Sequence, residues 1–129
     1  MNLVTQAFWV ELRRSGPTIE MSQWSTLRRI GRNPCTMSEL ARHKGVGLPT
    51  ISKSVEMLVR RGWVERWIDK SDRRQTMVRL TASGRGVLAE CRQALETFLD
   101  ERLAHLTAAE RNAVDASLQL VRKVLTVED

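Results

Sequence analysis

The stretch "VERWIDKSDRRQTMVRLT", residues 64–81, decides the fold that we expect for this chain. Residues 63–68 and 75–81 are rich in Trp, Val, Ile, Thr and Met and partly alternate, which predicts two antiparallel strands. The residues between them read "DKSDRR", and at the centre of this turn three cations, Lys70, Arg73 and Arg74, lie around the carboxylate of Asp72. The sequence therefore predicts a short β-hairpin with a basic tip.

Apolar residues at helical spacing predict two helices near the beginning of the chain. The first covers residues 2–14 and is ended by Gly16 and Pro17. The second begins with Ser22 as its N-cap and stops at Gly31, just before an Asn-Pro pair. The inward face of this second helix is formed by Trp24, Leu27 and Ile30.

Two further helices precede the hairpin. In "TMSELARHKG", Thr36 and Glu39 have capping-box spacing and Gly45 closes the helix. In "VGLPTISKSVEMLVRRG", Pro49 is tolerated in the first turn and Gly62 ends the helix. A short turn between these two helices is typical of a helix-turn-helix.

After the hairpin the apolar period returns to that of a helix. A stripe of about twenty residues follows Ala82, and Thr107 with Glu110 forms a second capping box that opens a last helix. The stripe consists of Val87, Leu88, Cys91, Leu95, Phe98, Leu99 and Leu103. The last helix has two apolar lines, which are Val114, Leu118, Val121 and Leu125, and Leu120, Val124 and Val127. The preceding helix can cover only one line, so we expect a second copy of the chain to cover the other.

Three helices followed by a two-stranded hairpin describe a winged helix-turn-helix. We therefore predict a mainly α protein with a small β-hairpin, in which the N- and C-terminal helices form a dimerisation region. The 129 residues suit a single domain, 1–129. Its winged core covers about 22–81, and its dimerisation helices cover about 2–14 and 82–127.

The net charge of +6 is concentrated in one segment. Residues 42–79 contain ten Lys or Arg against four Asp or Glu, whereas the other 91 residues contain eleven of each sign. A basic segment of this kind predicts an acidic partner, and nucleic acid fits better than lipid because the segment lacks a long amphipathic helix with an exposed aromatic face. We expect a cytoplasmic protein without a membrane partner, because the chain has no long apolar run and no secretion leader at Met1.

The fourth helix can be divided into an inner and an outer face. At 100° per residue Leu48, Ile51, Val55 and Leu58 share the inner face, so the outer face carries Pro49, Lys53, Glu56 and Arg60, flanked by Thr50 and Ser52. We predict that Pro49, Thr50, Ser52 and Lys53 contact DNA, and we favour Lys53 over Arg60 as a contact.

The basic tip of the hairpin then becomes a wing. Arg73 and Arg74 can follow the phosphate backbone or enter a narrow minor groove. We expect Asp72 to support the wing by accepting hydrogen bonds from Arg74 or from the loop backbone. The alternative is that Lys70, Arg73 and Arg74 form an ordinary solvated turn.

The sequence "MSELARHKGVGLPTISKSVEMLVRRGWVERWIDKSDRRQTMVRLTASGRGVL" resembles the DNA-binding core of the MarR (multiple antibiotic resistance regulator) family. The G-W-V-E-R strand, the D-x-R wing and the "LT..G" helix start carry the resemblance together. It implies a homodimeric regulator, often a repressor, that binds a pseudo-palindromic operator and is released by a small phenolic or other anionic effector or by oxidation. It also matches Asp72 and Arg74 to the family's wing pair, and Thr50, Ser52 and Lys53 to recognition-helix positions.

The chain departs from the family pattern in two places. Its first helix is shorter than usual, which affects part of the N-terminal dimer contact. Gly47 stands where the family commonly has a Ser or similar cap, and because glycine is an acceptable N-cap we expect the fourth helix to persist.

The resemblance places an effector pocket between the first two helices, the winged domain and the fifth helix. Trp9 and Trp24 become candidate walls, with Arg13 and Arg28 as anion partners, although tryptophans at such positions are more often core residues.

The remaining candidate groups point to no other chemistry. Cys91 lies on an apolar stripe, and we expect both Cys91 and Cys35 to pack. Cys35 lies at a helix start, where the dipole can lower a thiol pKa, so a redox sensor is the alternative. His43 and His105 lack further ligands at metal-binding spacing, so we expect neither metal nor cofactor. No catalytic constellation appears, so we do not expect an enzyme; a winged-helix scaffold that binds an acidic protein is the other alternative.

Overall fold

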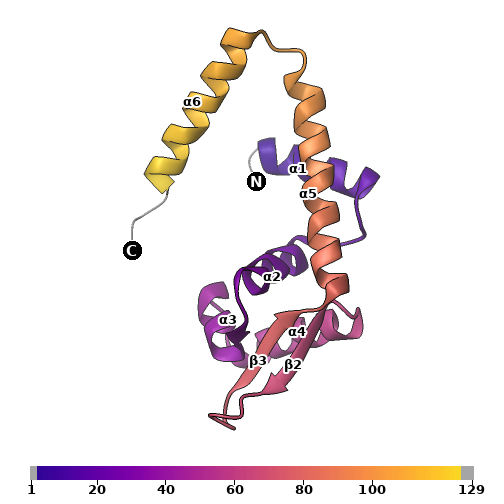
Figure 1. Ribbon diagram of the computed structural model, residues 1–129, viewed down its shortest axis with the longest axis vertical. Helices are drawn as coiled ribbons and strands as arrows, with labels where there is room; N and C mark the ends of the chain where they lie inside the picture. The colour runs from indigo at the N-terminus through magenta and orange to yellow at the C-terminus, as the bar shows by residue number, and fades with distance from the viewer. Residues whose placement is uncertain (1–2, 126–129) are drawn as a thin grey trace.

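The computed structural model describes residues 3–125 as a winged helical domain from which two helices extend (Figure 1). The elements in chain order are α1 (Leu3–Ser15), α2 (Met21–Arg32), β1 (Cys35–Thr36), α3 (Met37–Lys44), α4 (Leu48–Arg60), β2 (Val64–Ile68), β3 (Thr76–Leu80), α5 (Ala82–Leu103) and α6 (Ala108–Leu125). The fold is therefore mainly helical with a small antiparallel sheet, as the sequence predicts. Within residues 3–125, none of the helices has the length and apolar character needed to cross a bilayer.

The helix-turn-helix is built by the predicted end signals. Thr36 Oγ1 accepts a hydrogen bond from the Glu39 N–H at 3.0 Å, and Glu39 Oε2 accepts one from the Thr36 N–H at 2.8 Å. Gly45 closes α3 with a φ of 65°, which a residue with a side chain rarely adopts. Gly47 caps α4 through its carbonyl alone, which accepts the Ile51 N–H at 3.1 Å. The predicted capping box and the glycine N-cap are confirmed.

The bounds of α2 differ from those predicted at both ends. Its N-cap is Glu20, whose carbonyl accepts the Trp24 N–H at 2.9 Å, and Ser22 already lies inside the helix. The prediction of Ser22 as the cap is therefore wrong. Gly31 does not stop the helix either, which continues to Arg32. A Cβ at Gly31 would lie 3.0 Å from a Leu88 methyl group, so this glycine permits close packing rather than ending a helix.

Within residues 3–125 the sheet has three strands, not the two predicted. Its order is β1-β3-β2, with Cys35 opposite Val78 in one antiparallel pair and Arg66 opposite Val78 in the other. A strand of two residues is too short to produce an alternating pattern, so β1 could not be found from the sequence. Because β1 pairs with β3, the segment just before α3 is hydrogen-bonded to the wing hairpin.

The core lies where α2, α3, α4 and the sheet meet. Leu27, Leu40, Val55, Leu58 and Val78 are all fully buried there. Leu48, which was placed on the inner face of α4, is half exposed because it is the first residue of the helix and projects beyond the core.

The last helix stands away from the rest of the chain. Thr107 and Glu110 form the predicted capping box, with hydrogen bonds of 2.7 and 3.2 Å. Within its described range, however, α6 buries no side chain, and Figure 1 shows it descending apart from α5. The prediction that α5 of the same chain covers one apolar line is therefore wrong: the connection after Leu103 turns α6 away. Val127, predicted for the second line, lies outside the described residues.

Candidate nucleic-acid interface

The outer face of α4 is presented by a buried inner face. Ile51, Val55 and Leu58 anchor the helix in the core, with exposed fractions of 1% or less. The four predicted contact residues of α4 are all exposed: Pro49, Thr50, Ser52 and Lys53. They lie in the first half of the helix, so small hydroxyl groups and one ammonium group are grouped at its N-terminal end.

The two cations of α4 differ in their availability. Arg60 Nη2 lies 2.9 Å from Glu56 Oε1 one helical turn away, so its charge is already partly compensated. Lys53 is exposed and has no ion pair or hydrogen bond to another side chain within residues 3–125. The contrast agrees with the preference for Lys53 over Arg60.

The wing tip is shaped by two carboxylates. Asp69 Oδ1 accepts hydrogen bonds from the Ser71 N–H at 2.9 Å and from its hydroxyl at 2.8 Å, and the backbone bond holds the pKa of Asp69 below its usual value. Asp72 Oδ1 accepts the Arg74 N–H at 3.1 Å and lies 3.5 Å from Arg74 Nε. The Asp72 contacts are those expected of a wing support. Asp69 was missed, although Asp two residues before Ser is a known turn signal.

These hydrogen bonds leave the cations of the tip facing water. The Arg74 side chain is 94% exposed despite its proximity to Asp72. Lys70 and Arg73 are exposed and lack an ion-pair partner in the described part of the chain. The wing therefore presents positive charge on a loop whose backbone shape is held by its own carboxylates.

Other cations of the basic segment serve the fold instead. Arg61 Nη2 donates to the Thr18 carbonyl at 2.6 Å, Nη1 donates to Gln23 at 3.1 Å, and the guanidinium lies 3.7 Å from the Trp63 ring centroid. Arg79 forms an ion pair with Glu65 on the adjacent strand. Local charge does not distinguish Arg61 and Arg79 from the wing cations, so their structural role cannot be predicted from the sequence.

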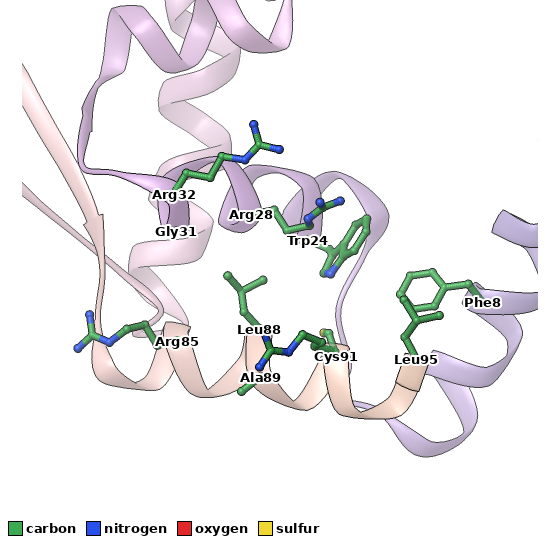
Figure 2. A pocket seen from close by; sticks show the side chains of 11 residues that line it. Phe8, Trp24, Arg28, Gly31, Arg32, Arg85, Leu88, Ala89, Cys91 and Leu95 are labelled. Carbon is green, nitrogen blue, oxygen red and sulfur yellow. The ribbon is translucent and has the colours of Figure 1, made fainter. Parts of the chain in front are cut away.

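The candidate pocket residues are divided between two hollows. A cleft of about 580 Å³ between α1, α2 and α5 is lined by Trp24 and Arg28 (Figure 2), whereas Trp9 and Arg13 line another hollow, beside Arg61. The Trp9 and Trp24 rings pack edge to face, with centroids 5.9 Å apart, and Trp9 is buried. The four residues thus do not line one pocket, because the two indoles pack together between the hollows.

Both thiols are buried. Burial raises the pKa of Cys91 to about 11, and burial likewise raises the pKa of Cys35 despite the nearby Arg29 charge. The prediction that both cysteines pack is confirmed, and the redox alternative loses the lowered Cys35 pKa on which it depends, because desolvation of the thiolate is the larger effect. Among residues 3–125, no three His, Cys, Asp or Glu side chains are grouped as metal ligands would be.

Known proteins of similar sequence belong to a family of transcriptional regulators. The sequence model of the MarR family matches residues 15–75. The multiple antibiotic resistance protein MarR of Escherichia coli is 32% identical over 109 residues, which cover 83% of this chain and 74% of that protein.

Solved structures show the same fold. The apo crystal structure of Escherichia coli MarR superposes with a TM-score of 0.73 at 28% identity, covering 95% of this chain and 91% of that one. Streptococcus pneumoniae FabT, crystallised in complex with DNA, superposes with a TM-score of 0.72 at 22% identity, covering 94% and 87%. With the winged fold, these matches establish that the chain belongs to the MarR family and is a DNA-binding transcriptional regulator, not an enzyme.

Proposed function

We propose that the protein is a repressor that binds a pseudo-palindromic operator as a homodimer and is released by a small aromatic or anionic effector. In this proposal α4 enters the major groove and the wing reaches the backbone or the minor groove. The protein acts in the cytoplasm, on chromosomal DNA. It is one domain, with α1, α5 and α6 as the dimerisation region.

The observation that carries the proposal is that α4 and the wing tip each expose a cation without a carboxylate partner among the described residues. Lys53 on α4 and Arg73 on the wing both lack carboxylate partners within residues 3–125. Thr50 and Ser52 can hydrogen-bond to base edges, whereas Arg73 and Arg74 neutralise phosphates. Asp72 holds the wing in shape and does not itself contact DNA.

The dimer is supported by the exposed apolar residues of α6. Leu118, Leu120, Val124 and Leu125 are each more than 60% exposed, and such a patch is unusual on a monomer. A two-fold partner that covers it would place two α4 helices about 34 Å apart, on successive major grooves.

Salt-dependent binding to DNA tests the interface. Arg74→Ala should weaken binding to operator and random duplex alike and reduce the slope of log K against log salt by about one. Lys53→Ala should instead change the preference between sequences. Arg29→Ala is the control, because Arg29 lies on α2, which belongs neither to the proposed DNA contacts nor to the proposed dimerisation region.

Equal affinity of the Arg74→Ala protein and the wild type would contradict the wing assignment. Failure of the wild type to bind any duplex at low salt would favour a winged scaffold for an acidic protein partner.

Light scattering tests the dimer. The wild type should have twice the chain mass at micromolar concentration, and Leu120→Glu combined with Val124→Glu should yield monomers with near-random DNA affinity. A monomeric wild type, or a monomeric variant that still binds a palindrome tightly, would contradict the proposal.

A further inference from the structure

The cleft between α1, α2 and α5 has an apolar interior and a basic rim. Figure 2 shows Trp24 and Leu88 facing each other across it, with Phe8 and Leu95 at one end. Four arginines also line it: Arg28, Arg32, Arg85 and Arg92. Among the described residues that line the cleft, none is Asp or Glu. Its volume of about 580 Å³ lies in the range of small-molecule sites.

The four arginines are not equally available. Arg85 donates to the Leu80 carbonyl at 3.1 Å, and Figure 2 shows it extending away from Leu88 toward the strands. Arg92 Nε lies 3.5 Å from Glu96 on the next turn of α5. These two cations are therefore already engaged by the protein.

Arg28 and Arg32 remain without carboxylate partners in the described part of the chain. They are four residues apart on α2 and so lie on one side of it, where like charges repel each other. Figure 2 shows Arg28 beside Trp24, with its guanidinium 4.7 Å from the ring centroid, and Arg32 also lines the cleft. One anionic group would compensate one of these charges and leave the other uncompensated.

We infer that the cleft binds an organic dianion with an aromatic or apolar body. The body packs between Trp24 and Leu88, Arg28 binds one anionic group, and Arg32 binds the other. Arginine suits this task because its planar fork matches the oxygens of a carboxylate. The inference rests on the proposed role of this cleft as the effector site and names the class of effector.

Two ligands with one ring system test the requirement for two charges. Naphthalene-2,6-dicarboxylate and 2-naphthoate differ by one carboxylate, and calorimetric titration of the whole protein measures both affinities. The dicarboxylate should bind about tenfold more tightly at low salt, and added salt should reduce the difference because both arginines are exposed.

Three variants test which arginine binds the second carboxylate of the ligand. Arg32→Gln should remove the preference for the dicarboxylate and change naphthoate affinity less than about twofold, whereas Arg28→Gln should weaken both ligands. Arg29→Gln is the matched control, because it removes the same charge from the same helix at a residue that does not line the cleft. Thermal unfolding confirms that each variant is folded.

Equal binding of the two ligands would overturn the inference, as would a loss of preference in Arg29→Gln as large as in Arg32→Gln. DNA affinity is measured separately with and without ligand. Dicarboxylate binding that leaves DNA affinity unchanged supports the ligand class and refutes the cleft as the effector site. DNA binding without a dicarboxylate preference refutes the ligand class alone.

Discussion

Gly84 connects the wing to α5, and its replacement by alanine gives the sharpest test of the packing. It is the third residue of α5 and is buried against the backbone of Trp63, just before β2. A Cβ at this position would lie 2.0 Å from the Trp63 carbonyl oxygen and 2.9 Å from its carbonyl carbon. The oxygen belongs to the backbone and accepts the Thr81 N–H at 3.0 Å, so it cannot move aside as a flexible side chain would.

The cost follows from these contacts. Overpacking of this kind destabilises a protein by about 1–3 kcal/mol, and displacement of the Trp63 carbonyl weakens a backbone hydrogen bond by about 1 kcal/mol. The better helix propensity of alanine offsets roughly 1 kcal/mol of this loss in the free energy of unfolding. We expect Gly84→Ala to lower the free energy of unfolding by about 2 kcal/mol and the melting temperature by about 8 °C.

Gly86→Ala is the matched control, because Gly86 is in the same helical turn and a Cβ there would meet no atom within 4 Å. This variant should be about 0.5–1 kcal/mol more stable than the wild type. Urea unfolding followed by circular dichroism measures both values. A Gly84→Ala protein as stable as the wild type would refute the close approach, and equal losses at both positions would show that helix geometry, not the Trp63 contact, is responsible.

Three further predictions concern the C-terminal end of α4, the N-terminal end of α3 and the two thiols. Arg61→Ala should destabilise the protein by about 1–3 kcal/mol in urea unfolding, because it removes the hydrogen bonds to Thr18, before α2, and to Gln23, within α2. The control Arg60→Ala, at an exposed arginine, should change stability by less than about 0.5 kcal/mol. Similar losses in the two variants would contradict the structural role of Arg61. The pKa of Glu39 is lowered in the folded state by its hydrogen bond from the Thr36 backbone, so its stabilising contribution is present above its unfolded pKa and lost as pH falls through the folded one. The stability difference between the wild type and Glu39→Gln should therefore shrink between about pH 6 and about pH 3, and a constant difference would refute the linkage. Because burial raises the pKa of both Cys35 and Cys91, iodoacetamide should label the native protein far more slowly than the unfolded protein at neutral pH, and rapid labelling would revive the redox alternative.

The sequence alone predicted the features whose causes are local. The capping box of Thr36 and Glu39 depends on residues three apart, and the left-handed turn at Gly45 depends on one residue without a side chain. The hairpin from 64 to 81 likewise follows from two apolar runs separated by a polar turn. Such signals need no knowledge of the rest of the fold, so the winged helix-turn-helix could be recognised from them.

Local signals failed where a distant contact decides the outcome. Gly31 before an Asn-Pro pair is a local signal for a helix end, yet α2 continues one residue further, to Arg32, and Leu88 of α5 packs closely against Gly31. The two-residue strand β1 exists only because β3 pairs with it. Propensity is weak enough that packing partners far away in the sequence override it.

The candidate sites divide in the same way. The sequence by itself determined that Lys53, Arg73 and Arg74 face outward, because periodicity and turn chemistry place them there. Only the tertiary structure decided that Arg61 serves the fold, that Trp9 and Trp24 border separate hollows, and that Arg32 joins Arg28 beside one cleft. A guanidinium has the same charge wherever it occurs, and its role depends on which carbonyl, ring or carboxylate the folded chain brings within a few ångströms of it.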